Sequence, residues 1–243
     1  MSQPSRDSLA IKVKGLSKAF GRTGVLRNLD LEVPWGEFLA IFGANGSGKT
    51  TLIRTLASLT RPDSGQIDVA GLSSRREGEK IRTIIGVVTH NILLYEELTV
   101  YENLKFYGRM FALKDVDQRI NDAVGQMGLS HRMHQRVRIL SHGMQKRLSI
   151  ARALLHHPSI LLLDEPESGL DQEALGLLQK AIGITKGSLR AVLMTTHNVE
   201  YGLSMADRVA IIADGKIVHK ESKETLDVAG FRNTYLHFTG SAL

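Results

Sequence analysis

The stretch GANGSGKT at residues 43–50 contains the residue types that can hold the phosphate groups of a nucleotide. Its glycines let successive backbone N–H groups turn toward phosphate oxygens, while Lys49 can reach the β- and γ-phosphates and the Thr50 hydroxyl can ligate Mg²⁺. An apolar run precedes the stretch and a helical pattern follows it, which favours a site for ATP and Mg²⁺ over a glycine-rich turn that binds nothing. The residues expected to contact the nucleotide are Gly43, Ala44, Asn45, Gly46, Ser47, Gly48, Lys49, Thr50 and Thr51.

Two adjacent carboxylates end a second apolar run, in the sequence LLLDEP. We call the phosphate-binding stretch at residues 43–50 the P-loop. Asp164 can lie beside a Mg²⁺ ion held at the P-loop on a neighbouring strand, and Glu165 can then polarise the attacking water as a general base. The alternative, a carboxylate that only caps the following helix, is credible for Glu167 or Asp171. It is weak for the pair Asp164 and Glu165, because the end of a buried strand is otherwise a poor place for two charges.

A histidine, His197, follows a third apolar run, AVLMTT. In a nucleotide-binding core its imidazole could hydrogen-bond the γ-phosphate. A lone histidine is more often structural or exposed, so this residue by itself is a weak signal.

The stretch LSHGMQKRLSIARALLHHP at residues 140–158 predicts a helix that could hold a second phosphate. Ser141 stands at the N-cap, Gly143 lets a ligand approach the backbone, and the first turn offers free N–H groups and a partial positive charge. Without the other motifs, an ordinary capped helix would be the better interpretation. The apolar positions that repeat at helical spacing are Met144, Leu148, Ala151 and Leu155.

The elements around these residues alternate between strands and helices, which predicts an α/β core carrying a helical insertion. Thr99 to Glu102 reads as a capping box that opens the insertion, and Gly128 ends a second helix beginning near Asp117. The dipeptide of Asp214 and Gly215 predicts a two-residue hairpin turn. Strands are expected at residues 9–15, 29–33, 38–42, 84–88, 160–164, 191–196 and 208–213.

Composition narrows the class of protein further. The 243 residues contain no cysteine, which excludes disulfides and fits a reducing cytoplasm, and no apolar run approaches the length of a membrane span. The N-terminal MSQPSRDS lacks the apolar segment of a signal peptide. The net charge of +6 is read as a solvated surface, because no basic stripe interleaved with aromatics indicates a nucleic-acid partner.

Taken together and in this order, the motifs resemble those of the ATP-binding cassette ATPases over residues 9–220. The specific part of the resemblance is the combination of the P-loop, the helix start at LSHG, the D-E pair, SGLD at residues 168–171 and a histidine after a later strand. It implies a P-loop NTPase core, with a mostly parallel sheet and an antiparallel N-terminal part, and an inserted helical subdomain. It also implies an ATP hydrolase that drives membrane-spanning transporter subunits from the cytoplasmic face of the plasma membrane.

The resemblance assigns further roles. Two cassettes pack head to tail as a homodimer, so Ser141 and Gly143 of one chain would meet the γ-phosphate held by the P-loop of the other. Phe20 would stack on adenine, and Asp171 would belong to a loop that crosses the dimer interface. The sequence departs from the family pattern at His142 and Met144, and at His90, which stands where a glutamine usually contacts the metal and the attacking water. An imidazole can hydrogen-bond a water but cannot replace an amide carbonyl as a metal ligand.

Within the family, the stretches SHGMQKRLSIARALLHHP, HNILLYEELTVYENLKFYGRM and FRNTYLHFTG look like the ATP-binding subunit of the haem exporter of cytochrome c biogenesis. ABC-2-type exporters of drugs, lipids or polysaccharides are the next alternative. Soluble family members of DNA repair or translation would carry a long coiled coil or two cassettes, and a P-loop kinase would lack the LSHG helix. The expected organisation is one ATPase domain at 1–243, with a core at 9–90 and 159–220, a helical subdomain at 91–158 and a C-terminal tail at 221–243.

Overall fold

A computed structural model describes residues 8–183 and 189–240 and divides into two compact units. Unit 1 is drawn from the chain up to Ile85, from Ser159–Glu165 and from the chain after Ile184, and unit 2 from Gly86–Pro158 and Pro166–Gly183. The described residues do not include residues 1–7 or residues 241–243 of the tail. The expectation that the N-terminus lacks a signal peptide falls on residues 1–7. No helix in the described part of the chain is long and apolar enough to cross a membrane.

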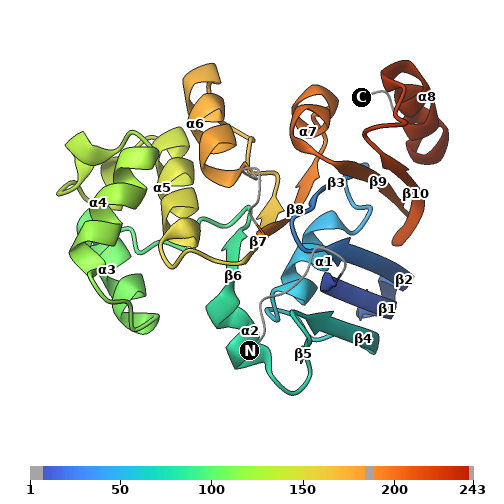
Figure 1. Ribbon diagram of the computed structural model, residues 1–243, viewed down its shortest axis with the longest axis horizontal. Helices are drawn as coiled ribbons and strands as arrows, with labels where there is room; N and C mark the ends of the chain where they lie inside the picture. Colours follow the sequence, from blue (N-terminus) through green and yellow to red (C-terminus); the bar gives the residue numbers. More distant parts are fainter. Residues whose placement is uncertain (1–7, 184–188, 241–243) are drawn as a thin grey trace. The chain divides into compact units, whose positions relative to one another are not determined.

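The N-terminal strands of unit 1 form an antiparallel sheet in the order β2-β1-β4-β5, which Figure 1 shows beside helix α1. The alternation expected at residues 9–15 is confirmed, since Ile11 and Val13 are buried while Lys12 and Lys14 are exposed. The strand continues beyond the alternating stretch because register shifts break the two-residue period without ending the pairing. The bounds are Leu9–Phe20 for β1, Thr23–Pro34 for β2, Ser64–Val69 for β4 and Leu72–Ser73 for β5.

A second sheet in unit 1 runs in the order β10-β9-β3-β8-β7 and is parallel except for β10. Every residue of β3, β7 and β8 is buried, as expected for apolar strands covered on both faces. Asp214 and Gly215 join β9 to β10 with φ values of 48° and 75°, which confirms the predicted hairpin turn. The bounds are Phe38–Phe42 for β3, Ile160–Asp164 for β7, Ala191–Thr196 for β8, Arg208–Ala213 for β9 and Lys216–Ser222 for β10.

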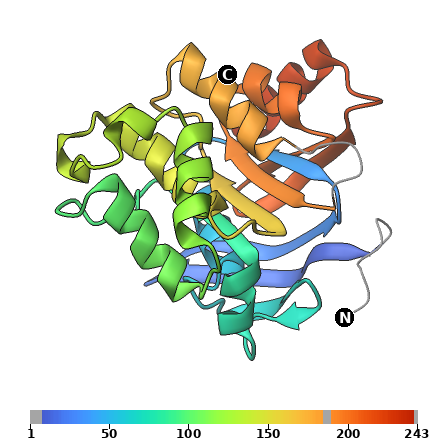
Figure 2. The ribbon, with the colours of Figure 1, turned by 60° about the vertical axis from the view of Figure 1, so that its left-hand side comes forward.

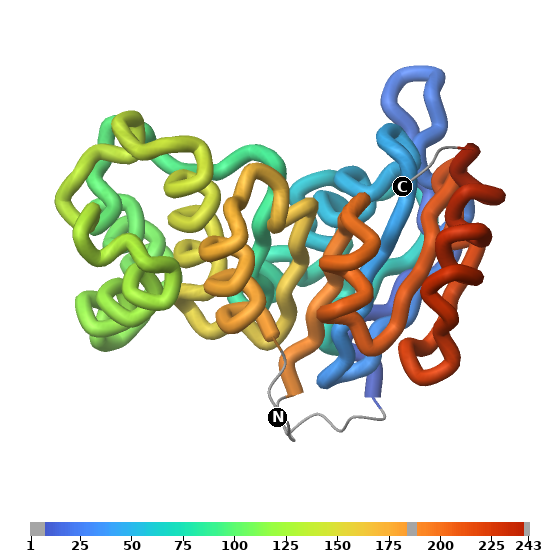
Figure 3. The backbone as a smooth tube through the Cα atoms, turned by 90° about the horizontal axis from the view of Figure 1, so that it is seen from above, coloured from blue at the N-terminus to red at the C-terminus, as the bar shows by residue number. Residues whose placement is uncertain are grey.

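The helices of unit 1 include one that the sequence did not predict. The C-terminal tail forms α8, which lies along β9 in Figure 3 and packs the ring of Phe231 edge-on against Phe42 at 5.1 Å between ring centroids. A fully buried aromatic pair of this kind anchors the tail to the core. The bounds are Lys49–Leu56 for α1, Gly78–Ile84 for α2, Val199–Met205 for α7 and Val228–Thr239 for α8.

Unit 2 is mainly helical, and Figure 2 shows α3, α4 and α5 packed as one group. It also holds α6, because α6 packs against α5 and Leu177 of α6 lies beside Gly128. The structure therefore places residues 166–183 with the helices, whereas the sequence prediction placed them in the core. The bounds are Val100–Met110 for α3, Val116–Gln126 for α4, His142–Leu154 for α5 and Gln172–Ile182 for α6, with strand β6 at Ile85–Val88 beginning at the boundary between the units.

The capping box at the start of α3 is present as predicted, and its loss should be measurable. Thr99 Oγ1 accepts from the Glu102 N–H, and the Glu102 carboxylate accepts from the Thr99 N–H at 2.8 Å. We expect Thr99→Ala to lower the free energy of unfolding by about 1 kcal/mol, whereas Thr99→Ser should change it little. Urea denaturation of both variants measures this, and equal stability of Thr99→Ala and the wild type would contradict it.

The same hydrogen bonds give the cap a pH dependence. Hydrogen bonds from the backbone and side chain of Thr99 hold the pKa of Glu102 below its ordinary value. The stabilisation is therefore present above the unfolded-state pKa of about 4.3, and it is lost as the pH falls through the lower folded-state pKa. The difference in stability between wild type and Thr99→Ala should accordingly shrink in acid.

Candidate nucleotide site

The register of three parallel strands brings the expected catalytic residues to one edge of the sheet. Phe42 pairs with Thr196, and Thr195 pairs with Asp164, so β3, β8 and β7 end level with one another. Ligands of open α/β sheets bind outside the carboxyl ends of the strands. The P-loop strand and the Asp164 strand were expected to be neighbours, and this is wrong because β8 lies between them. The crossover connections insert β8 but keep all three strands parallel, so the ends still meet.

The P-loop follows β3, and two of its glycines are packed closely against neighbouring strands. A Cβ atom on Gly43 would lie 2.5 Å from the carbonyl oxygen of Ile212, and one on Gly48 would lie 2.8 Å from Leu26 Cδ2. Gly48 also has a φ of 108°, in the region that favours glycine. The loop therefore presents backbone, not side chains, at the start of α1.

Lys49 is held inside this loop. Its side chain is 6% exposed, and Nζ donates to the carbonyl oxygen of Gly43 at 2.6 Å and to that of Ala44 at 3.2 Å. The same ammonium lies 3.5 Å from Glu165 Oε1. A buried cation with three nearby oxygens is poised to exchange them for phosphate oxygens.

Asp164 and Glu165 lie in contrasting surroundings at the end of β7. Asp164 is 2% exposed and accepts a hydrogen bond from Thr195 Oγ1 at 2.7 Å. Glu165 has a φ of 45°, an uncommon left-handed conformation for a residue with a side chain, and its N–H donates to the carbonyl oxygen of Thr195 at 3.0 Å. Strained backbone of this kind clusters at functional sites, where the surrounding structure holds it in place.

The second oxygen of Glu165 meets His197, whose Nδ1 lies 3.3 Å from Oε2. The imidazole is 58% exposed, so it remains open to a ligand. In helix α8, burial raises the pKa of Tyr235, and the negative charge of Glu165 raises it further. Unit 1 thus brings together Lys49, Asp164, Glu165 and His197.

Two residues near the site were missed by the sequence interpretation. Thr195 could have been found, because a hydroxyl in a fully apolar buried strand needs a hydrogen-bond partner. Tyr235 carries no local signal, since the effect of Glu165 on its pKa depends on where the tail packs.

The residues present fit a nucleotide and a divalent cation. The N-cap residue of α1 is Gly48, which has no side chain to cap the helix. The first N–H groups of α1 are therefore left for phosphate oxygens. Ser47 Oγ is buried without a hydrogen-bond partner among the described residues. Among the residues that the structure describes, no group of three or more His, Cys, Asp or Glu side chains could hold a metal ion. Thr50 and Asp164 are instead the oxygen donors suited to Mg²⁺, which takes few protein ligands and keeps water and phosphate oxygens.

Phe20 ends β1 with 55% of its surface exposed. The following strand, β2, lies against the P-loop through Val25 and Leu26, which contact the position of Gly48. Lys18 Nζ lies 5.4 Å from the ring centroid. An exposed ring on a hairpin that touches the P-loop is suited to stacking on a base.

The second expected phosphate site lies in unit 2. Ser141 caps α5 by accepting from the Met144 N–H at 3.3 Å. A Cβ atom on Gly143 would lie 3.3 Å from the carbonyl oxygen of Gly169, so the start of α5 lies against the turn before α6. Asp171 caps α6 by accepting from the Ala174 N–H at 2.8 Å, which agrees with the alternative interpretation of Asp171 as a helix cap. The roles of these residues across a dimer stay predictions.

His90 is exposed in the loop after β6, next to Thr89, whose hydroxyl donates to the carbonyl oxygen of Asn91 at 2.6 Å. If His90 contacts the attacking water, we expect His90→Gln to preserve or raise the hydrolysis rate, because an amide can ligate both metal and water. His90→Ala, which can do neither, should lower it by about tenfold or more. Steady-state ATPase assays measure both, and equal rates for His90→Ala and wild type would place His90 outside the site.

The fold and motifs agree with comparisons to known proteins. The sequence profile of the ABC transporter family matches residues 26–168. The Bacillus subtilis protein named "Uncharacterized ABC transporter ATP-binding protein YdbJ" is 36% identical over 220 residues, which cover 89% of this chain and 70% of that protein. The "Daunorubicin resistance ATP-binding protein DrrA3" of Streptomyces coeruleorubidus is 34% identical over 219 residues, which cover 89% and 69%.

A solved structure extends the agreement to three dimensions. The dimeric post-hydrolysis state of the ATP-binding cassette MJ0796, bound to ADP and Pi, has a TM-score of 0.80 and 26% identity, and the match covers 89% of this chain and 100% of that chain. The P-loop NTPase fold expected from the sequence is confirmed. The chain belongs to the ABC transporter family, as an ATP-binding subunit that hydrolyses ATP.

Proposed function

We propose that this chain, as a homodimer on the cytoplasmic face of the plasma membrane, powers the export of a small organic molecule through membrane-spanning subunits. The observation that carries the proposal is the cluster of Lys49, Glu165 and His197 at the strand ends. It places a cation for phosphate beside a carboxylate that can accept a proton from water. The similarity to DrrA3, named for daunorubicin resistance, supports an exported organic substrate.

Lys49 and Glu165 exchange partners in this proposal. In the structure the ammonium of Lys49 holds Glu165 Oε1. When phosphate oxygens draw Lys49 away, Glu165 becomes free to accept a hydrogen bond and then a proton from the attacking water. His197, already in contact with the other carboxylate oxygen, orients Glu165 and donates to the γ-phosphate.

Thr50 and Asp164 are the residues that would hold Mg²⁺. The ion, when bound, neutralises charge that develops on the phosphate oxygens. Thr195 keeps Asp164 in place through its hydrogen bond of 2.7 Å. His90 positions the water or a metal-bound water from its exposed loop.

The remaining site residues act across the dimer. Ser141 and Gly143 present the N-terminus of α5 to the γ-phosphate bound by the partner subunit's P-loop, and Asp171 lies at that interface. Phe20 stacks on the adenine of the nucleotide held by its own chain. The dimeric MJ0796 structure supports this assembly.

An exposed aromatic and aliphatic face on unit 2 is the proposed contact with the membrane-spanning partner. Tyr95 packs edge-on against Phe106 at 5.1 Å, and Phe106 and Met110 of α3 are 43% and 59% exposed. Large apolar side chains gathered on one face mark protein interaction sites. This face suits a helix presented by the membrane subunit.

The exported molecule is the open part of the proposal. The stretches that resemble a haem exporter support haem. DrrA3, by contrast, is named for resistance to the drug daunorubicin. We favour an amphiphilic drug-like substrate on this ground and keep haem as the alternative that the experiment separates.

A deletion strain complemented in trans tests the proposal. We expect deletion to raise the cellular accumulation of daunorubicin severalfold and leave c-type cytochromes unchanged. The wild-type gene and Glu200→Gln, a change at an 87% exposed carboxylate, should restore export, whereas Glu165→Gln should not. Loss of haem-stained c-type cytochromes with unchanged drug accumulation would contradict the drug assignment in favour of haem. No change in either quantity would contradict both.

A further inference from the structure

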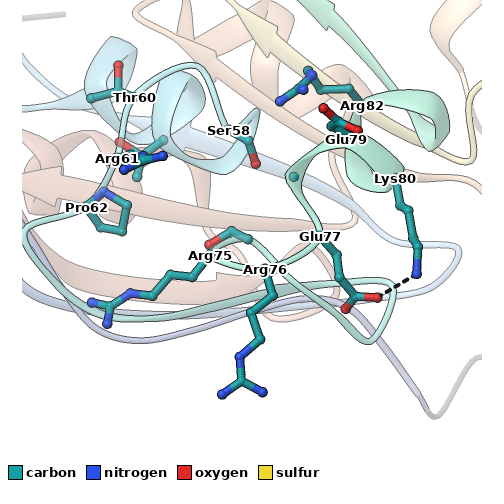
Figure 4. Close-up of a pocket in the computed structure, with 13 residues that line it drawn as sticks. Ser58, Thr60, Arg61, Pro62, Arg75, Arg76, Glu77, Glu79, Lys80 and Arg82 are labelled. Atoms are coloured by element: carbon teal, nitrogen blue, oxygen red, sulfur yellow. Dashed lines mark hydrogen bonds and ion pairs between the residues drawn. The ribbon is translucent and has the colours of Figure 1, made fainter.

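A basic pocket of about 730 Å³ opens in unit 1 at the end of α1 that is remote from the P-loop (Figure 4). Thr55 and Ser58 line it, while Lys49 begins the same helix, so about 10 Å of helix separates the pocket from the P-loop. Three segments form its wall: the end of α1, the turn at residues 60–62 and the segment 74–82. The volume lies in the range of sites for small-molecule ligands.

Four guanidinium groups line this pocket and lack an ion pair or side-chain hydrogen bond among the described residues. Lys80 pairs with Glu77 at 3.0 Å, and the hydrogen bond from Lys80 holds the pKa of Glu77 below its ordinary value, so these two charges cancel. Glu79 is the remaining carboxylate among the described lining residues, so one negative charge faces four positive charges. The four residues are Arg61, Arg75, Arg76 and Arg82.

Two hydroxyl groups lie buried in the same wall. Ser58 Oγ and Ser74 Oγ are shielded from solvent and have no hydrogen-bond partner among the described residues. Ser58 also has a φ of 56°, which places this serine in a left-handed conformation at the end of α1. Buried hydroxyls without partners are unfavourable, so their presence beside unpaired cations indicates that a ligand satisfies them.

We propose that this pocket binds a small anion carrying one or more phosphate groups. Arginine is suited to phosphate because its planar fork donates two parallel hydrogen bonds, and here all four unpaired cations are arginines. Phosphate oxygens point in several directions, which matches donors from three segments, whereas a carboxylate offers two oxygens in one plane. The phosphate belongs either to a soluble phosphorylated molecule or to a lipid headgroup.

The test measures binding with the P-loop already filled. The full chain is saturated with Mg²⁺ and a fluorescent ADP analogue, whose signal shows that the P-loop stays occupied. Inorganic pyrophosphate is then titrated by calorimetry. In a second arm the chain is sedimented with phosphatidylcholine vesicles that contain or lack phosphatidic acid.

Two double variants and one matched control decide the outcome. We expect Arg61→Ala with Arg82→Ala to weaken binding by roughly tenfold for each guanidinium, and Ser58→Ala with Ser74→Ala to weaken it severalfold. The control, Lys12→Ala with Arg54→Ala, removes the same charge from exposed positions outside the pocket and should change binding less than about twofold.

Pyrophosphate binding supports a soluble ligand, and sedimentation that requires phosphatidic acid supports a lipid headgroup. The proposal is overturned if neither probe binds, or if the control weakens binding as much as the pocket variants do. Tighter binding of a polyglutamate peptide than of either phosphate probe would also overturn it, in favour of an acidic protein segment. The thermal unfolding midpoint of each variant separates lost binding from lost folding.

Discussion

The variant Glu165→Gln is expected to hydrolyse ATP about 10²-fold or more slowly than the wild type while still binding ATP. The amide keeps the size and shape of the carboxylate, so it can stay near Lys49 and His197, which lie 3.5 Å and 3.3 Å from the two carboxylate oxygens. It cannot accept a proton from water. ATP-bound dimers should therefore accumulate, and size-exclusion chromatography with ATP measures them.

The control for this variant removes an exposed carboxylate that is not one of the proposed site residues. Glu200→Gln changes a side chain that is 87% exposed and should leave turnover unchanged. Near-normal hydrolysis by Glu165→Gln would show that another group takes the proton. Loss of ATP binding would instead show that Glu165 supports the P-loop through Lys49.

The second large effect is expected when two inactive variants are mixed. Lys49→Ala removes the buried cation that should bind phosphate, and Gly143→Asp places a carboxylate where the start of α5 should meet the γ-phosphate. Each alone should be nearly inactive. In a mixed dimer, one site combines the intact P-loop of the Gly143→Asp chain with the intact α5 of the Lys49→Ala chain.

The recovered activity has a defined size. Random pairing makes half of the dimers mixed, with one good site each, so activity should return to roughly a quarter of the wild-type value if the sites act independently. If both sites must hydrolyse ATP together, the hydrolysis rate stays low. Trapped nucleotide measured in the mixture then reports the single complete site. Absence of both recovery and trapping would contradict a site shared between chains.

A neutral variant separates charge from crowding in this experiment. The Cβ atom of Gly143→Ala would lie 3.3 Å from the carbonyl oxygen of Gly169, so that carbonyl must yield by a few tenths of an ångström. We expect Gly143→Ala to keep most of the activity. Full activity of Gly143→Asp alone would mean that the stretch is only a capped helix.

The features predicted correctly from sequence depend on residues close together in the chain. The P-loop, the capping box of Thr99 and Glu102, and the turn of Asp214 and Gly215 each follow from a short pattern with its own geometry. The N-cap of Ser141 is of the same kind.

The features that were missed depend on contacts between distant segments. Only the crossovers determine that β8 separates β3 from β7. The burial of Arg152, which donates to the carbonyl oxygen of Val87 at 2.7 Å, could not be read from a basic residue in a helix. The effect of Glu165 on the pKa of Tyr235, and the gathering of Arg61 and Arg82 around one pocket, likewise require the folded chain.

The left-handed backbone conformation of Glu165 lowers the stability of the fold at the same position that carries the proposed general base. A residue with a side chain held at a φ of 45° costs the fold about 1 kcal/mol or more, and glycine would relieve most of that strain. Directed evolution that rewards heat resistance alone would therefore drift toward glycine at position 165 and lose the base that the proposed chemistry needs. Thermostable variants of this chain are better sought in libraries that hold residue 165 fixed and vary the exposed surface.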